Sequence, residues 1–177
     1  MNLRLLLLLG LGCAALTACT PRAAAPSFGK PTGTFSVSFD HYAINVQDLD
    51  ASVDFYQRVF GLEEIYDGTE KEHIRWLSLG GGMSLHVIEA DRSALRLQKG
   101  VHLALAVARF DAFVEHLREL EVPFETWTGV PRETNSRPDG VRQVYLRDPD
   151  GYWVEVNDGR LGWERAVTGR PPTLDKI

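Results

Sequence analysis

The sequence predicts an α+β fold in which one βαβββ module occurs twice. Residues 41–53 align with residues 102–114 at a constant offset of 61 positions, and residues 74–89 align with residues 143–158 at an offset of 69. Within each copy, apolar residues first alternate as in a strand, then recur at helical spacing, and then alternate again. A repeat with this order of periodicities is typical of a duplicated module.

The first residues predict a lipoprotein signal ahead of the folded part. Arg4 precedes an apolar stretch, Leu5 to Ala18, that is shorter than the roughly 20 residues of a membrane span. The residues Leu16-Thr17-Ala18-Cys19 then resemble the lipobox of bacterial lipoproteins, in which the cysteine is lipidated. We expect a signal peptide at 1–18, and a lipidated Cys19 that begins a flexible tether at 19–35, rich in Ala, Pro and Gly. An uncleaved anchor helix and a plain signal peptide are the alternatives.

The first copy of the module is expected to contain a strand, a helix and three further strands. Residues 39–46 alternate as a strand does, Asp48 or Asp50 can cap the helix, and Gly61 can end it. The apolar positions of this helix are Val53, Tyr56, Val59 and Phe60. The three later strands are expected at 62–66, 74–79 and 83–88, with glycines 80–82 in the last turn.

The second copy repeats this order with a longer loop. Its first strand lies around 101–107, and Asp111 is the expected cap of its helix. The buried stripe of that helix is Phe113, Val114, Leu117 and Leu120, and the later strands are expected at 124–127, 141–147 and 152–157. The loop around 131–138 is longer than its counterpart in the first copy, which explains why the offset between the copies grows by eight positions, from 61 to 69. Asp148–Gly151 fits a tight turn between the last two strands. The domain therefore spans 36–158, and residues 159–177 are expected to form a surface tail.

Four strands each carry one His or Glu on a face that is otherwise small or polar, while the opposite face is aliphatic. These residues are His41, His86, His102 and Glu155. Each alone could be a hydrogen-bonded structural residue, but four at corresponding positions indicate a metal site. Three imidazoles and one carboxylate suit Zn, Ni, Fe, Mn or Co, and His41, His102 and Glu155 alone would form a two-His-one-carboxylate triad.

Aromatic and amide side chains near these positions could line a mostly apolar substrate pocket. They are Trp76, Gln143, Tyr145 and Trp153. Core aromatics of a small barrel are the alternative interpretation. His73 and His116 are interpreted as structural, because the first has no counterpart in the second copy and the second lies on a helix beside Glu115 and Arg118.

Six segments together resemble the vicinal oxygen chelate superfamily, which includes glyoxalase I, extradiol dioxygenases, fosfomycin-modifying thiol transferases and metal-free bleomycin-binding proteins. The segments are His41–Ile44, Asp54–Tyr56, Val59–Leu62, Leu85–Ile88, Val101–Ala104 and Asp148–Glu155. The resemblance implies two modules that form a cupped mixed sheet around one divalent metal. It also implies that His41, His86, His102 and Glu155 are the ligands, within one chain or across a homodimer.

The resemblance further implies a metal-dependent enzyme acting on a small substrate with two vicinal oxygens. Glyoxalase I has a glutamate where this chain has His86, so Glu155 is the expected catalytic base and lactoylglutathione lyase activity is not expected. A glyoxalase-like lyase or isomerase and a dioxygenase-like enzyme both fit. The alternative is a lipid-anchored binding module that sequesters a small molecule. The lipobox places the protein at the bacterial cell envelope, on the periplasmic side, and Thr20 favours the outer membrane.

Composition excludes several other classes of protein. The 177 residues are 44% hydrophobic and 24% charged, which is typical of a globular domain. The net charge of −5 gives no electrostatic case for nucleic-acid binding. Cys13 and Cys19 are the only cysteines, so the folded part has neither a disulfide framework nor a cysteine-ligated metal.

Overall fold

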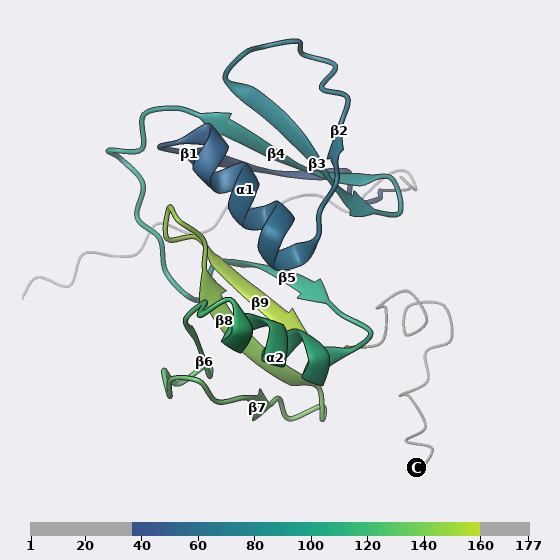
Figure 1. The fold of residues 1–177 in the computed structure, drawn as a ribbon, viewed down its shortest axis with the longest axis vertical. Coiled ribbons are helices and arrows are strands. Elements are labelled where there is room, and N and C mark those ends of the chain that lie inside the picture. Colours follow the sequence, from purple (N-terminus) through teal and green to yellow (C-terminus); the bar gives the residue numbers. More distant parts are fainter. Residues whose placement is uncertain (1–36, 160–177) are drawn as a thin grey trace, which may run out of the picture. The chain divides into compact units, whose positions relative to one another are not determined.

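The computed structural model describes residues 37–159, which form two helices and two mixed sheets (Figure 1). The first module consists of β1 (His41–Val46), α1 (Leu49–Phe60), β2 (Glu64–Ile65), β3 (Ile74–Gly80) and β4 (Met83–Glu89). The second consists of β5 (His102–Ala106), α2 (Phe110–Glu119), β6 (Phe124–Glu125), β7 (Asn135–Ser136), β8 (Arg142–Arg147) and β9 (Trp153–Asn157). The α+β class and the pair of modules are thereby confirmed. The predicted signal peptide, Cys19, the tether and the tail after Gly159 lie outside the described residues.

The two sheets have the same strand order. One runs β1-β4-β3-β2 and the other β5-β9-β8-β6, with β7 added on β8. In each sheet the first strand of the module is parallel to the last, and the last two strands form an antiparallel hairpin. Because the strands pair in the same way in both sheets, Trp76 lies opposite His86 in the first and Tyr145 lies opposite Glu155 in the second.

Helix α1 begins and ends where the sequence predicts. The Asp48 carboxylate accepts a hydrogen bond of 2.9 Å from the backbone N–H of Ala51, and Gly61 ends the helix at φ 67°. A side chain at that positive φ would be strained, so glycine suits the position.

The predicted cap of α2 is wrong. Arg109 is the N-cap residue, without a side-chain hydrogen bond to the helix, and Asp111 lies in the first turn. Phe110 is buried, and the helix begins at this residue, two positions earlier than a cap at Asp111 would give. The carboxylate of Asp111 instead pairs with the Arg142 guanidinium at 2.7 Å. The short strand β7 was not predicted, and β2 and β6 are shorter than expected.

The aliphatic faces of both sheets pack with both helices in one hydrophobic core. Figure 1 shows α1 against the first sheet and α2 beside β8 and β9. The core includes Ile44, Val87, Val114, Val144 and Val154. Because side chains alternate along a strand, the His- and Glu-bearing faces lie on the opposite sides of the two sheets, away from this core.

The turn between β8 and β9 joins the modules through polar contacts. The Tyr56 hydroxyl of α1 donates to the buried carboxylate of Asp148 at 2.9 Å, and the Ser52 hydroxyl donates to Asp150 at 2.7 Å. Burial raises the pKa of Asp148 to about 6, although the hydrogen bonds it accepts act in the opposite direction. None of the helices in residues 37–159 is long and apolar enough to cross a membrane.

Candidate metal site

The four predicted ligands meet as two pairs. His41 lies against His86 in the first module, and His102 lies beside Glu155 in the second. Within residues 37–159, no three His, Cys, Asp or Glu side chains gather in a geometry that could hold a metal ion. In the described part of the chain the four predicted ligands therefore form two separate pairs, which we call the first and the second half-site.

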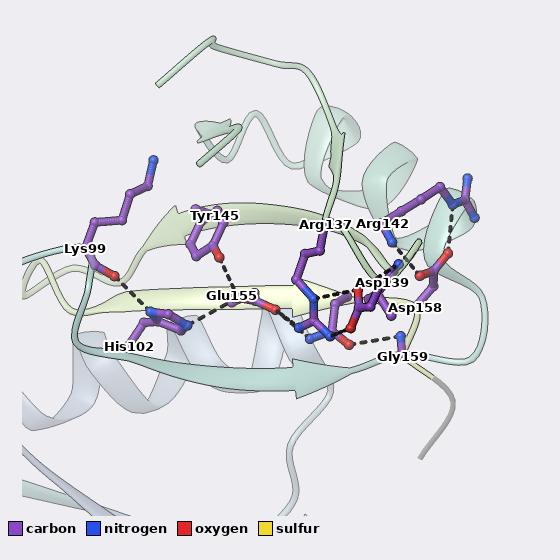
Figure 2. Close-up of polar contacts among 11 residues, drawn as sticks. Lys99, His102, Arg137, Asp139, Arg142, Tyr145, Glu155, Asp158 and Gly159 are labelled. Carbon is purple, nitrogen blue, oxygen red and sulfur yellow. Dashed lines mark hydrogen bonds and ion pairs between the residues drawn. The ribbon is translucent and has the colours of Figure 1, made fainter. Parts of the chain in front are cut away.

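The second half-site is arranged like a pair of neighbouring metal ligands. His102 Nε2 lies 3.2 Å from Glu155 Oε2, while His102 Nδ1–H donates to the carbonyl oxygen of Lys99 at 2.8 Å (Figure 2). That bond leaves Nε2, on the side of the carboxylate, as the nitrogen that a metal would bind, as in many metal-binding histidines. Two ligands that each lie about 2.1 Å from one ion are separated by roughly 3.0 to 3.4 Å, depending on geometry. The residues present thus fit a divalent metal.

Glu155 is buried and accepts hydrogen bonds on both carboxylate oxygens. Oε2 accepts from the Tyr145 hydroxyl at 2.5 Å, while Oε1 accepts from Asn157 Nδ2 at 2.7 Å and from Arg137 Nη1 at 3.2 Å. Figure 2 shows Tyr145 and Arg137 approaching the carboxylate from β8 and the loop before it. All three donors hold the carboxylate in place and direct Oε2 toward His102. Burial, and then the bond to Glu155, raise the pKa of Tyr145 well above its ordinary value.

The first half-site is a stack of three rings. The His41 and His86 rings lie 4.1 Å apart with planes 5° from parallel, and Trp76 stacks on the other side of His86 at 4.0 Å and 3°. An imidazole nitrogen binds a metal in the plane of its ring. Two face-to-face rings at this separation therefore do not direct lone pairs to one ion about 2.1 Å from each.

His41 is the better placed donor of the two. Its Nδ1 is held by the Asp40 carboxylate at 2.6 Å, which leaves Nε2 for a metal, and its side chain is 44% exposed. His86 lies between two rings, and its Nε2 is bound to the Ser84 hydroxyl at 2.9 Å. Burial, and then the neighbouring His41, lower the pKa of His86.

The predicted substrate-binding residues are divided between the modules. Gln143, Tyr145 and Trp153 lie with Glu155 on one face of the second sheet, whereas Trp76 lies on the first. Gln143 Oε1 and Trp76 Nε1 are buried and have no hydrogen-bond partner in the described part of the chain. Two surface cavities, of about 310 and 260 Å³, lie elsewhere, beside Arg92 and Arg147 and beside Phe55 and Leu120. That the predicted residues line a substrate pocket stays a prediction.

Three residues of the site were not predicted. The backbone carbonyl oxygen of Lys99 accepts the hydrogen bond from His102. The Lys99 ammonium lies 4.6 Å from the Trp153 ring centroid and 5.0 Å from that of Tyr145. Asn157 shares the strand face of Glu155, so the alternation already indicated its position. Arg137 belongs to the segment that lengthens the second copy, and the extra length was the only signal for it in the sequence.

Comparisons with known proteins agree with this architecture. The family model described as Glyoxalase/Bleomycin resistance protein/Dioxygenase superfamily matches residues 38–156. A 2-epi-5-epi-valiolone epimerase from Actinomyces sp is 31% identical over 146 residues, which cover 68% of this chain and 79% of that protein. Metallothiol transferase FosB from Shouchella clausii (strain KSM-K16) is 29% identical over 126 residues, which cover 69% of this chain and 80% of that protein. Among solved structures, Oxidase ChaP-H2 superposes with a TM-score of 0.59 at 26% identity, over 72% of this chain and 98% of that chain.

Proposed function

Because the chain belongs to the Glyoxalase/Bleomycin resistance protein/Dioxygenase superfamily, we propose that it is a metal-dependent enzyme that binds a small substrate through two neighbouring oxygen atoms. The observation that carries this proposal is the His102–Glu155 pair, with its separation of 3.2 Å and its anchored Nδ1. The superfamily relatives include a metallothiol transferase, an epimerase and a lactoylglutathione lyase, so membership of the superfamily does not define one reaction.

The proposed ligands are His41, His102 and Glu155. The ring stack argues for His86 as a neighbour of the metal-bound imidazole instead of a fourth ligand. Two histidines and one carboxylate leave coordination positions open, which is the arrangement that an enzyme needs in order to bind two substrate oxygens. Four protein ligands in a closed tetrahedral site would instead favour a binding or structural role.

We propose that a second copy of the chain completes the site. The two donor pairs lie on faces turned away from a shared core, so one chain does not bring them together without disrupting that core. Both half-sites reach the surface, with His41 44% and His102 22% exposed. Large exposed apolar residues lie beside each: Phe39 is two positions before His41, and the Trp127 ring lies 6.4 Å from that of His102. A twofold homodimer would pair His41 of one protomer with His102 and Glu155 of its partner, giving two equal sites.

The chemistry of this site depends on one carboxylate. When bound, a divalent metal supplies positive charge that stabilises negative charge developing on a substrate oxygen. Glu155 is the group that accepts the substrate proton, and Tyr145, Asn157 and Arg137 hold it in place. The absence of a second carboxylate at position 86 argues against lactoylglutathione lyase activity. A lyase or isomerase with one base and a dioxygenase-like reaction both agree with the donor set.

Mixed dimers test this proposal directly. His41→Ala and His102→Ala proteins are each expected to bind little Mn²⁺ or Zn²⁺. When the two are unfolded together and refolded at equal concentrations, each heterodimer contains one intact site. About a quarter of the wild-type metal content should therefore return, as measured by elemental analysis after gel filtration.

The controls separate the elements of the proposal. Each variant refolded alone should recover no metal. If the mixture also recovers none while wild type binds metal, the site lies within one chain and the proposed dimer is wrong. If purified wild type refolds but takes up no divalent metal, the enzyme proposal itself is wrong.

A further inference from the structure

The loop that lengthens the second module brings a guanidinium to the candidate metal site. Arg137 lies in this loop, and its Nη1 donates to Glu155 Oε1 at 3.2 Å. Its Nε and Nη2 donate to the two oxygens of Asp139, at 3.2 and 2.7 Å. Asp139 thus holds the guanidinium in a fixed orientation beside the carboxylate (Figure 2).

Arg137 has donors left for a ligand. A guanidinium carries five N–H groups. The contacts within residues 37–159 use three of them, one on each nitrogen, and leave one N–H on Nη1 and one on Nη2. Two such N–H groups form the fork that binds the oxygens of a carboxylate or a phosphoryl group. The side chain is 34% exposed, so a ligand can reach it.

The charge at the site favours an anion once a metal is bound. Arg137 with Asp139 and Glu155 carries a formal charge of −1. A divalent ion changes this to +1 when the histidines are neutral. A positive, partly buried site stabilises a negatively charged ligand more than a neutral one of the same shape.

A buried acceptor on the same face indicates a hydroxyl group on the ligand. Gln143 lies opposite Asn157 in the sheet, and its Oε1 is buried without a hydrogen-bond partner among the described residues. An unsatisfied buried acceptor is costly, and a ligand hydroxyl could satisfy it.

We propose that Arg137 binds an anionic group of the substrate, so that the substrates are small hydroxylated carboxylates or phosphates rather than neutral diols. This inference rests on the proposed function, because it places the anion beside a metal held by Glu155. Arg137 is then a specificity-determining residue that the loop adds to the second module.

The test compares two ligands that share a vicinal diol. Glycerol is neutral, whereas glycerate has a carboxylate in place of one CH₂OH group, and glycerol phosphate in a parallel arm distinguishes a carboxylate from a phosphate preference. Dissociation constants are measured on Mn²⁺-loaded protein by titration calorimetry and by the Mn²⁺ electron paramagnetic resonance signal. In wild type, at least one of the anions is expected to bind about ten-fold or more tightly than glycerol.

The variants assign this preference to one side chain. Arg137→Gln should remove about ten-fold or more of the preference, and Arg137→Lys should keep part of it because the charge remains. Arg132→Gln removes a positive charge from the same loop without a contact to Glu155, and it should leave the preference unchanged. A purely positioning role for Arg137 would instead weaken Mn²⁺ binding and reduce the affinity for glycerol and glycerate equally.

Two outcomes overturn the inference, and they can be told apart. If wild type binds Mn²⁺ but the anionic preference is absent, or survives in Arg137→Gln, the inference is wrong and the proposed function stands. If wild type binds no Mn²⁺, the proposed function is wrong and the inference falls with it.

Discussion

Glu155 receives hydrogen bonds from three side chains, and this environment defines what its substitution should do. In Glu155→Gln, one oxygen remains for the metal, but the amide no longer accepts a proton. We expect activity to fall by about 100- to 10,000-fold while metal affinity falls much less. Turnover is measured under saturating metal, on the best substrate from a panel of vicinal diketones, hemithioacetals and catechols. Metal affinity is measured separately, by titration of both proteins with metal. Equal losses of metal binding and activity would show that the carboxylate acts only as a ligand.

The ring stack predicts different roles for the two histidines of the first half-site. His41→Ala should reduce metal affinity by about 10-fold or more. Removing a side chain that only supports a metal ligand already reduces metal affinity by about this factor, so removing a ligand should cost at least as much. His86→Ala removes a ring that lies between two others, and it should change metal affinity only a few-fold. Competition with a chelator of known affinity measures both. An equal loss in the two variants would make His86 a ligand.

The sequence located these residues because strands alternate with period two. That pattern placed His102 and Glu155 on one face, and the structure brings them within 3.2 Å of each other. The contact of Arg137 with Glu155 could not be predicted in the same way. A loop has no periodicity, so the direction of Arg137 depends on Asp139 and on the short strand β7.

At the scale of elements, the two helix starts provide a matched pair. The Asp48 carboxylate accepts a hydrogen bond from a backbone N–H of α1. Asp111 does not cap α2, and its carboxylate forms an ion pair with Arg142 at the surface. We expect Asp48→Ala to lower the free energy of unfolding by about 1 kcal/mol. Asp111→Ala should cost less, about 0.5 kcal/mol or under, because exposed ion pairs contribute little. Urea unfolding of both variants measures the difference, and a larger cost for Asp111→Ala would contradict the assignment.

The sequence alone could not distinguish these two caps. Both aspartates precede an apolar stripe with helical spacing, so local pattern favours both equally. The burial of Phe110, which is a tertiary effect, starts α2 before Asp111 and decides the outcome. Strands β2 and β6 are short for a similar reason, since strand ends depend on the neighbouring strand rather than on propensity.

The turn between β8 and β9 should make stability depend on pH. Burial raises the pKa of Asp148 from 3.8 to about 6, so the folded state binds a proton more tightly than the unfolded state does. The contribution of Asp148 is therefore fully present below about pH 4 and is lost as the pH rises through about 6. Asp148→Asn should lack this decline, while other groups titrate as before. Unfolding free energies of both proteins from pH 4 to 7 test this, and parallel curves would contradict it.

At the scale of the whole chain, lipidation at Cys19 remains a prediction from the sequence. Cells that are fed a palmitate analogue should label wild type, because the cysteine follows a short apolar stretch and a lipobox-like sequence. Cys19→Ser should take up no label, while Cys13→Ser should still be labelled. Labelling of Cys19→Ser, or a mature protein that starts at another residue with a free thiol, would show that Cys19 is not the lipidated residue.

Duplication was visible in the sequence, whereas the relation between the half-sites was not. Alternation shows which face of a strand is aliphatic, and both sheets do turn those faces into one core. It does not show what covers the polar faces, because that depends on how the modules and any second chain meet. The sequence therefore predicted four ligands on the polar faces of the strands, while leaving open whether one chain holds them all; that these residues bind a metal stays a prediction.

The equal strand order of the two modules also bears on how such a site could have evolved. A twofold dimer of single modules would present identical side chains on both sides of a central ion. Two modules in one chain are released from that symmetry, because a substitution in one is not repeated in the other. In this protein the first module carries an aromatic stack, while the second carries a carboxylate, a tyrosine and an arginine on a longer loop. Two modules of unequal sequence therefore present an uneven surface, which is able to distinguish the two ends of a ligand.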